Sequence, residues 1–346
     1  MEKEFINPEA LSSFRSRAVD FYSVFREAME EVIIGEPDAV EMAAALLLGG
    51  SRGAMTGILC GDTGTGKSKF IESVPKVLGL DKSQQVANIP HKLDLTPSQL
   101  MGKQESVTKS YSESGSISYE DISVKHKAMI GDTTKIILFD EINRTSPAAL
   151  NAALKIIQDG YIEVYNDLNQ LITVNDFDLI LCSMNNYGTI STSDLDPAIL
   201  SRLSMGVIMG KKQDNGLTAA AEYLWDNQGQ ITEEIKPHPN LYKFIAEDRK
   251  YVDRVPVSKE IIEVGKKVTK QANEIMADHG FETGDGRLSY QLIKIAKILS
   301  LINNHIEVND KDIIRAAYFN LTGKLGALGV KYADLDSLKS DLSKVV

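Results

Sequence analysis

The residues best suited to chemistry form one glycine-rich segment. Residues 61–68 read Gly-Asp-Thr-Gly-Thr-Gly-Lys-Ser, which fits the pattern G-x-x-x-x-G-K-[ST]. Glycines let backbone N–H groups approach phosphate oxygens, and a helix that begins near Lys67 would point its positive end at the same anion. We therefore predict an ATP site in which Lys67 reaches the β- and γ-phosphates and Ser68 ligates Mg²⁺. Its phosphate-binding residues are Gly61, Asp62, Thr63, Gly64, Thr65, Gly66, Lys67 and Ser68.

An acidic pair follows an apolar run further along the chain. The run Ile136–Phe139 is followed directly by Asp140 and Glu141. We expect Asp140 to hold Mg²⁺ and Glu141 to orient and polarise the attacking water, because phosphoryl transfer depends on positioning and charge neutralisation. By itself the pair is also typical of a strand that runs into a solvated turn. Its place downstream of a phosphate loop favours the catalytic interpretation.

Parallel strands would bring these segments together. The run 56–60 reads as a buried strand, and 136–139 and 179–182 are continuous apolar runs, which suit a parallel sheet covered by helices. A helix is predicted from Pro37 to Leu48, and another begins at Ser146-Pro147 and ends at Gly160. Strand, loop, helix and strand in this order indicate an α/β fold.

The remaining chain is predicted to be mainly helical. Residues 1–31 read as a helical lead-in, and residues 32–212 are assigned to the nucleotide-binding core. Residues 213–256 show no clear pattern and are assigned as a connecting segment. Apolar residues at three- and four-residue steps then predict a helical domain over 257–346, in which one helix opens at the N-cap residue Asn309.

The segment Asp140–Arg144, Asp-Glu-Ile-Asn-Arg, resembles the corresponding sequence of the MoxR-type AAA+ ATPases, which belong to the helix-2-insert group. The continuation from Pro147 to Leu154 is also similar, and the resemblance runs from about Val32 to the end, with a poor match at 213–256. It implies an AAA+ P-loop NTPase core, with a parallel sheet flanked by helices, followed by a small all-helical lid domain.

The resemblance also implies a helix-2 insert. The stretch Asp94–Gly102 is similar to the segment that precedes the insert in the family. The polar, turn-rich residues 110–115 lie between two short strand-like runs, 106–108 and 116–119, which predicts a hairpin over about 103–120. A surface hairpin without a binding role is the alternative.

The same resemblance assigns roles to individual residues. Ile33 and Ile34 would lie beside the adenine, although a hydrophobic staple before the next helix is an alternative. Asn185 would be sensor 1, with the neighbouring Asn186 as the alternative register. Arg287 would be sensor 2 and would reach back to the γ-phosphate.

An arginine supplied by a neighbouring subunit is expected to complete the site. The stretch Asp196–Leu203 resembles the helix that carries this arginine finger, so Arg202 is the candidate, with Arg144 as its competitor. The expected assembly is a homo-oligomeric ring, a hexamer, in which ATP hydrolysis at subunit interfaces remodels a protein partner. By resemblance, that partner carries a von Willebrand factor A domain.

Two other functions remain open. One is another helix-2-insert motor, either of the metal-chelatase type or associated with DNA. The other is a nucleotide-gated scaffold that binds ATP with little turnover. The net charge of −10, from 38 basic and 48 acidic residues, argues against a nucleic-acid partner.

Composition indicates where the chain works. The N-terminal residues resemble no signal peptide, and the longest apolar stretch, Met42–Leu48, is too short to span a bilayer. Cys60 and Cys182 each follow an apolar run and read as buried thiols of a reducing compartment. We therefore expect a cytoplasmic protein without membrane insertion.

Overall fold

The structure is a computed structural model of all 346 residues. The structure describes residues 8–50, 55–83, 85–90, 95–102, 104–113, 116–125, 128–166, 170–175, 177–185, 195–212, 217–228, 235–281, 284–330, 335 and 337–344.

A five-stranded parallel sheet forms the centre of the molecule, in the order β2-β5-β8-β1-β9. Its strands are β1 (Thr56–Gly61), β2 (Val86–Ile89), β5 (Ile136–Phe139), β8 (Leu179–Asn185) and β9 (Met205–Ile208). The three predicted apolar runs are the three inner strands of the sheet, and they are buried along their whole length. The strands β2 and β9, which lie at the two edges, were missed by the sequence analysis.

Helices cover both faces of this sheet. The helices are α1 (Pro8–Glu30), α2 (Pro37–Gly49), α3 (Lys67–Val77), α4 (Pro97–Met101), α5 (Pro147–Asp159), α6 (Pro197–Leu200), α7 (Ala219–Asp226), α8 (Pro239–Asp248), α9 (Lys259–Asp278), α10 (Asp285–Ile302), α11 (Asp310–Ala327) and α12 (Leu338–Ser343). A Cβ on Gly57 of β1 would meet Leu46 of α2. Cys60 lies on the opposite face of β1, against Gly326 of α11.

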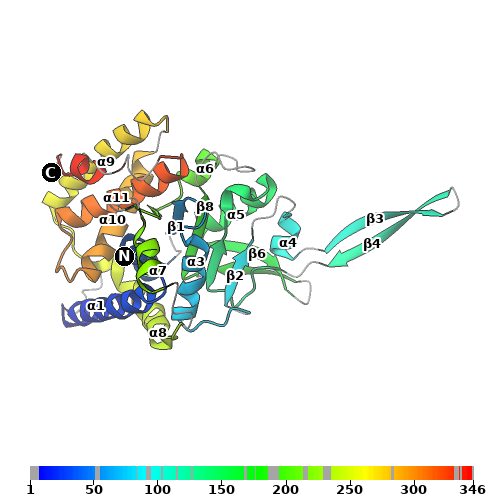
Figure 1. The fold of residues 1–346 in the computed structure, drawn as a ribbon, viewed down its shortest axis with the longest axis horizontal. Helices are drawn as coiled ribbons and strands as arrows, with labels where there is room; N and C mark the ends of the chain where they lie inside the picture. Colours follow the sequence, from blue (N-terminus) through cyan, green and yellow to red (C-terminus); the bar gives the residue numbers. More distant parts are fainter. Residues whose placement is uncertain are drawn as a thin grey trace, which may run out of the picture.

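The helical C-terminal region is confirmed. Figure 1 shows α9, α10 and α11 grouped on one side of the molecule. The hydroxyl of Ser258 caps α9, and Asn309 forms a capping box with Asp312 at the start of α11, as its N-cap position predicts. The helix α11 packs against β9 so closely that a Cβ on Gly206 would lie 2.2 Å from the Cα of Gly323.

Two antiparallel hairpins branch from the core. The strands β6 (Tyr161–Tyr165) and β7 (Leu171–Asn175) form one, and β3 (Gln104–Glu113) and β4 (Ser116–Lys125) form the other. The second is the predicted hairpin, which Figure 1 shows extending away from the core, and it ends at Lys125 rather than at about residue 120. Its predicted turn was placed too broadly, because residues 110–113 still pair within β3. Ladder hydrogen bonds sustain such a strand without an apolar pattern.

The segment 213–256 is more regular than its sequence indicates. It contains α7, α8 and a 3-10 helix over Arg249–Arg254. The side chain of Trp225 in α7 is 79% exposed, which explains why no apolar period marks this helix.

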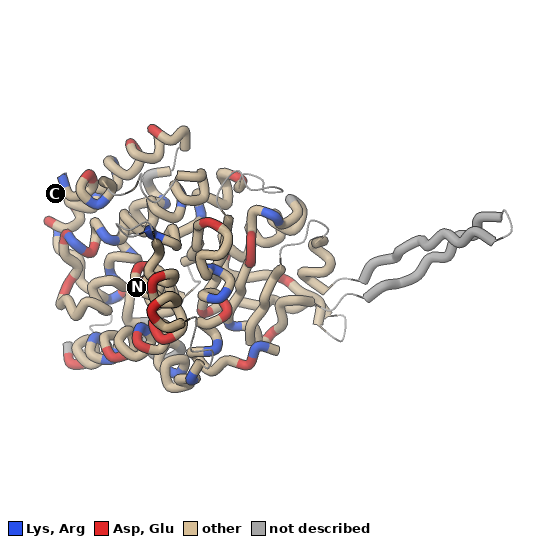
Figure 2. Tube along the Cα trace, viewed as in Figure 1, with Lys and Arg blue, Asp and Glu red and all other residues tan. Residues whose placement is uncertain are grey.

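Charge and hydropathy of the described residues agree with the composition. Figure 2 shows basic and acidic positions interspersed along the chain. No helix that the structure describes is long and apolar enough to cross a bilayer.

Candidate active site

The phosphate loop joins β1 to α3. Gly61, Gly64 and Gly66 have φ values of 149°, 87° and 88°, a region that side chains disfavour. A Cβ on Gly61 would lie 2.8 Å from the carbonyl oxygen of Met209, so only glycine fits there. A Cβ on Gly64 or Gly66 would meet no heavy atom within 4 Å, so the backbone of the loop is open to a ligand at the start of α3.

Lys67 is held by its own loop. Its ammonium group donates to the carbonyl oxygens of Gly61, at 2.9 Å, and Asp62, at 2.7 Å, and to the hydroxyl of Thr65, at 3.3 Å. Burial lowers the pKa of Lys67, opposed by the neighbouring acidic groups. The Lys67 ammonium group therefore donates to loop oxygens the hydrogen bonds that it could otherwise donate to phosphate oxygens.

Asp140 lies at the carboxyl end of β5 and meets Ser68 across the sheet. The Ser68 hydroxyl donates to Asp140 Oδ1 at 3.1 Å, and the hydroxyl of Ser183 in β8 donates to the same oxygen at 2.6 Å. The two predicted Mg²⁺ ligands are therefore neighbours, although 72 positions separate them. Ser183, which directly follows the apolar run 179–182, was not predicted, because a single serine at the end of a strand carries no signal of its own.

Glu141 is held from two directions. Its Oε1 accepts a hydrogen bond from the Asn185 side chain, and its Oε2 forms an ion pair with Arg144 at 3.0 Å. Its φ of 48° lies in the left-handed region, which costs a non-glycine residue about 1 kcal/mol. Asn185, the predicted sensor 1, thus reaches the acid directly from the end of β8.

The predicted adenine segment lies beside the phosphate loop. Ile33 is buried and Ile34 is partly exposed, and the next residues connect them to the loop. The carboxylate of Glu36 accepts from the backbone N–H of Gly210 at 2.7 Å, and Gly210 abuts Thr65. Burial raises the pKa of Glu36 to about 7. Sequence analysis did not identify Glu36 or Gly210.

The helix α7 approaches the same segment. A Cβ on Gly35 would lie 2.3 Å from the Cβ of Ala219, the first residue of α7. No residue of α7 is fully buried in the described structure, so this helix rests on the adenine segment with little packing. It lies in the segment to which the sequence analysis assigned no structure.

Arg202 and Arg287 lie close together, and both are bound within the chain. The guanidinium of Arg202, which follows α6, donates to Gln158 of α5 at 2.7 and 3.0 Å and to the carbonyl oxygen of Ala198 at 2.6 Å. Arg287, in the first turn of α10, donates to the hydroxyl of Ser201 at 2.8 Å. Burial and the charge of Arg287 lower the pKa of Arg202.

Two further hydrogen bonds join the helical region to the segment around Arg202. The Gln291 amide of α10 donates to the carbonyl oxygen of Arg202 at 3.4 Å, and the Asn320 amide of α11 donates to the carbonyl oxygen of Ser204 at 2.9 Å. Asn320 also donates to Gln291 and accepts from the ammonium group of Lys324 at 2.8 Å. Lys324 is 1% exposed, and burial lowers its pKa to about 7.

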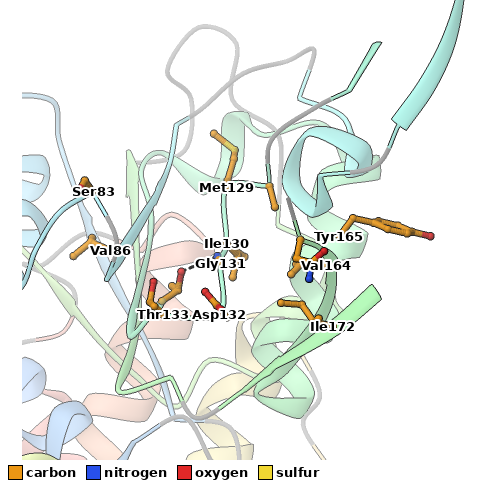
Figure 3. Close-up of a pocket in the computed structure, with 13 residues that line it drawn as sticks. Ser83, Val86, Met129, Ile130, Gly131, Asp132, Thr133, Val164, Tyr165 and Ile172 are labelled. Atoms are coloured by element: carbon orange, nitrogen blue, oxygen red, sulfur yellow. Dashed lines mark hydrogen bonds between the residues drawn. The ribbon is translucent and has the colours of Figure 1, made fainter. Parts of the chain in front are cut away.

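A separate cavity lies away from these residues. Its volume is about 460 Å³, and Figure 3 shows lining residues from the segment before β2, the segment before β5 and the β6–β7 hairpin. Ser83 and Val86 lie at the amino end of β2, and Thr134 precedes β5. Because the strands are parallel, this cavity lies at the amino ends of the strands, whereas Gly61, Asp140 and Asn185 lie at their carboxyl ends.

The residues fit a nucleotide with Mg²⁺. The open backbone at Gly64 and Gly66 and the ammonium group of Lys67 provide the donors that phosphates need. Among the described residues, no group of three or more His, Cys, Asp or Glu side chains is arranged to hold a metal ion. Ser68 and Asp140 would therefore hold Mg²⁺ together with phosphate and water oxygens, the ligands that this ion prefers.

Comparison with known proteins agrees with this geometry. Residues 57–203 match the family of AAA domains described as the dynein-related subfamily. The chain thus contains an AAA domain that extends from β1 to just beyond Arg202. A search of curated proteins found no match.

Among solved structures, the chain is similar to the crystal structure of a protein from Cytophaga hutchinsonii that is provisionally described as an ATPase. The TM-score is 0.64 at 18% sequence identity, over 98% of this chain and 97% of that chain. At this identity, the likeness shows a shared fold, which includes the helical region after the AAA domain.

Proposed function

We propose that this AAA-domain chain is an ATP-driven motor of the MoxR type, which hydrolyses ATP at subunit interfaces and thereby remodels a protein partner. The observation that carries the proposal is the convergence of Lys67, Ser68, Asp140, Glu141 and Asn185 at the carboxyl ends of the inner strands. These residues come from a phosphate loop and from two neighbouring strands. They supply the positive charge, the metal ligands and the carboxylate that phosphoryl transfer requires.

Each side chain has a distinct role in this proposal. Lys67 exchanges its contacts with the loop carbonyl groups for contacts with the β- and γ-phosphates of ATP. Mg²⁺, when bound by Ser68 and Asp140, supplies further positive charge at the phosphates. Glu141 orients the attacking water and accepts its proton, and Asn185 keeps the Glu141 carboxylate at the end of the sheet.

Glu141 must change partners before it can act. In the isolated chain its carboxylate is bonded to Asn185 and paired with Arg144. A base engaged in this way holds water poorly, so the isolated subunit turns over slowly. We propose that assembly into a ring, a hexamer, draws Arg144 away and supplies Arg202 from the adjacent subunit.

The remaining parts of the proposal rest on the MoxR resemblance. The partner is a protein with a von Willebrand factor A domain, and the motor works in the cytoplasm. The thiols of Cys60 and Cys182, which are buried and unpaired, suit a reducing compartment. Arg287 leaves Ser201 to contact the γ-phosphate when the helical region closes on ATP.

A second candidate is a nucleotide-gated scaffold that binds ATP with little turnover. The engagement of Glu141 by Asn185 and Arg144 favours it, because the same contacts that delay catalysis could abolish it. The two candidates differ in the assembled state, in which only the motor releases phosphate steadily.

The test compares phosphate release by the wild type with that of Glu141→Gln, with Lys67→Ala as the variant that fails to bind nucleotide. We expect turnover in the wild type at concentrations where light scattering shows rings. Glu141→Gln should lose about 10²-fold or more of kcat yet still bind ATP. Equal inactivity of wild type and Glu141→Gln in rings would refute the motor and leave the scaffold. Proteins that co-purify with the ATP-bound Glu141→Gln ring would identify the partner.

A further inference from the structure

Ser183 connects both acids of the site through a single hydroxyl. Its side chain is completely buried in β8. The hydroxyl donates to Asp140 Oδ1 at 2.6 Å and accepts from the backbone N–H of Glu141 at 2.8 Å. We propose that Ser183 is a positioning residue for ATP hydrolysis, which sets the metal-binding oxygen of Asp140 and the backbone of Glu141 together. This inference rests on the proposed function.

The strand register explains why a side chain is needed here. The pairing of β5 with β8 ends at Phe139 opposite Cys182. Beyond that pair, the chain leaves the sheet, and Glu141 adopts its left-handed φ of 48°. Its N–H group therefore has no ladder partner in β8, and the Ser183 hydroxyl accepts it instead. A residue without a hydroxyl would leave this partly buried N–H without that acceptor.

The same strand positions the Glu141 side chain. Residues 183 and 185 lie on one face of β8, because alternate residues of a strand share a face. Ser183 bonds the Glu141 backbone, and Asn185 bonds the Glu141 carboxylate. One strand thus fixes both ends of this residue, so loss of either bond changes where the carboxylate points.

The hydrogen bond from Ser183 to Asp140 involves the carboxylate that is proposed to hold Mg²⁺. Ser68 and Ser183 donate to the same oxygen of Asp140. A hydrogen bond to a carboxylate is among the stronger ones, and this one comes from a side chain packed on all sides. Groups that orient a metal ligand in this way typically change metal affinity or activity by about 10- to 100-fold when they are removed. Ser183 is therefore expected to affect Mg²⁺ dependence as well as turnover.

The experiment uses the assembled full-length chain and the variants Ser183→Ala and Ser183→Thr. Ser183→Ala should lower kcat by about 10- to 100-fold and raise the Mg²⁺ concentration for half-maximal binding of a fluorescent ATP analogue by a similar factor. Its affinity for the analogue in EDTA should stay that of the wild type, because the phosphate loop is intact. Ser183→Thr keeps the hydroxyl and should restore both quantities.

A matched control separates positioning from folding. Ser300→Ala removes another fully buried hydroxyl, which donates to the Lys297 carbonyl oxygen in α10. It should change thermal stability but neither kcat nor the Mg²⁺ midpoint. The proposal is overturned if Ser183→Ala likewise loses stability only. If Ser183→Ala fails to fold, Ser183→Cys, in which a slightly larger thiol weakens both hydrogen bonds, is measured in its place.

The two proposals fail in different ways. A wild-type ring without phosphate release would refute the motor, whereas the Mg²⁺ midpoint of analogue binding would still test Ser183. An unchanged midpoint in Ser183→Ala, beside an active wild-type ring, would refute the role of Ser183 alone.

Discussion

The buried Lys324 should make the stability of this protein depend on alkaline pH. Its ammonium group is 1% exposed and donates to Asn320, and burial lowers its pKa from 10.5 to about 7. An unfolded chain exposes the same lysine to water and binds its proton up to about pH 10.5. Between pH 7 and 10.5 the unfolded state therefore binds more protons than the folded state, and the free energy of unfolding rises with pH.

The size of this effect follows from the two pKa values. With a pKa of about 7 in the folded state, the gain between pH 7 and pH 9 is about 2 kcal/mol, because one pKa unit corresponds to about 1.4 kcal/mol. Unfolding entropy is about 2.1 cal/mol/K per residue, so for 346 residues the gain corresponds to about 3 °C in Tm.

The perturbation is Lys324→Met, compared with the wild type by thermal unfolding at pH 7, 8 and 9. Lys324→Met leaves the Asn320 oxygen without this donor. That loss lowers the stability of the variant by the same amount at every pH. The wild type should therefore gain about 3 °C relative to Lys324→Met as the pH rises from 7 to 9. Lys270→Met, at a lysine whose side chain is 80% exposed, is the control and should follow the wild type. Parallel curves for the wild type and Lys324→Met would refute the reasoning.

Three further predictions concern separate parts of the molecule. Arg202→Ala and Lys67→Ala subunits should each be inactive but should regain ATPase activity when mixed, whereas substantial activity of Arg202→Ala alone would transfer the finger role to Arg144. Gly206→Ala should lower the free energy of unfolding by about 1–3 kcal/mol, because its Cβ would strike α11, whereas Gly265→Ala, which meets open space on α9, should be neutral or stabilising in the same denaturation assay. The pKa of Glu36 is raised to about 7 in the folded protein, so the folded state keeps a proton on this carboxylate that the unfolded state releases near pH 4.5. The Tm of the wild type should therefore fall relative to that of Glu36→Gln as the pH rises from 5 to 8. A constant difference in Tm between the two proteins would contradict this.

The phosphate loop and the acidic pair could be predicted because their signals are local. Eight consecutive residues specify the turn and the start of α3, and the apolar run before Asp140 specifies a buried strand. The inner strands are continuous apolar runs, so they too were readable. The edge strands β2 and β9 have four residues each, and β9 includes Gly206, so no periodic pattern marks them.

The helical region shows the same division. Its helices follow from apolar spacing and from good N-caps such as Asn309. Its contacts with the Arg202 segment do not, because Gln291 and Asn320 look in sequence like ordinary polar residues of helices. In the folded structure both are buried, and they donate to the carbonyl oxygens of Arg202 and Ser204.

The sequence by itself therefore determined which side chains are candidates for chemistry, since residues 61–68 and the pair Asp140-Glu141 are specified over a few positions. The tertiary structure decided which side chains form hydrogen bonds to the same carboxylate oxygen. Ser183 meets Asp140 across 43 positions, and Ser68 meets the same oxygen across 72. Such meetings depend on the strand order β5-β8-β1 and on its register. Register arises from the packing of the whole sheet, which no short stretch of sequence encodes.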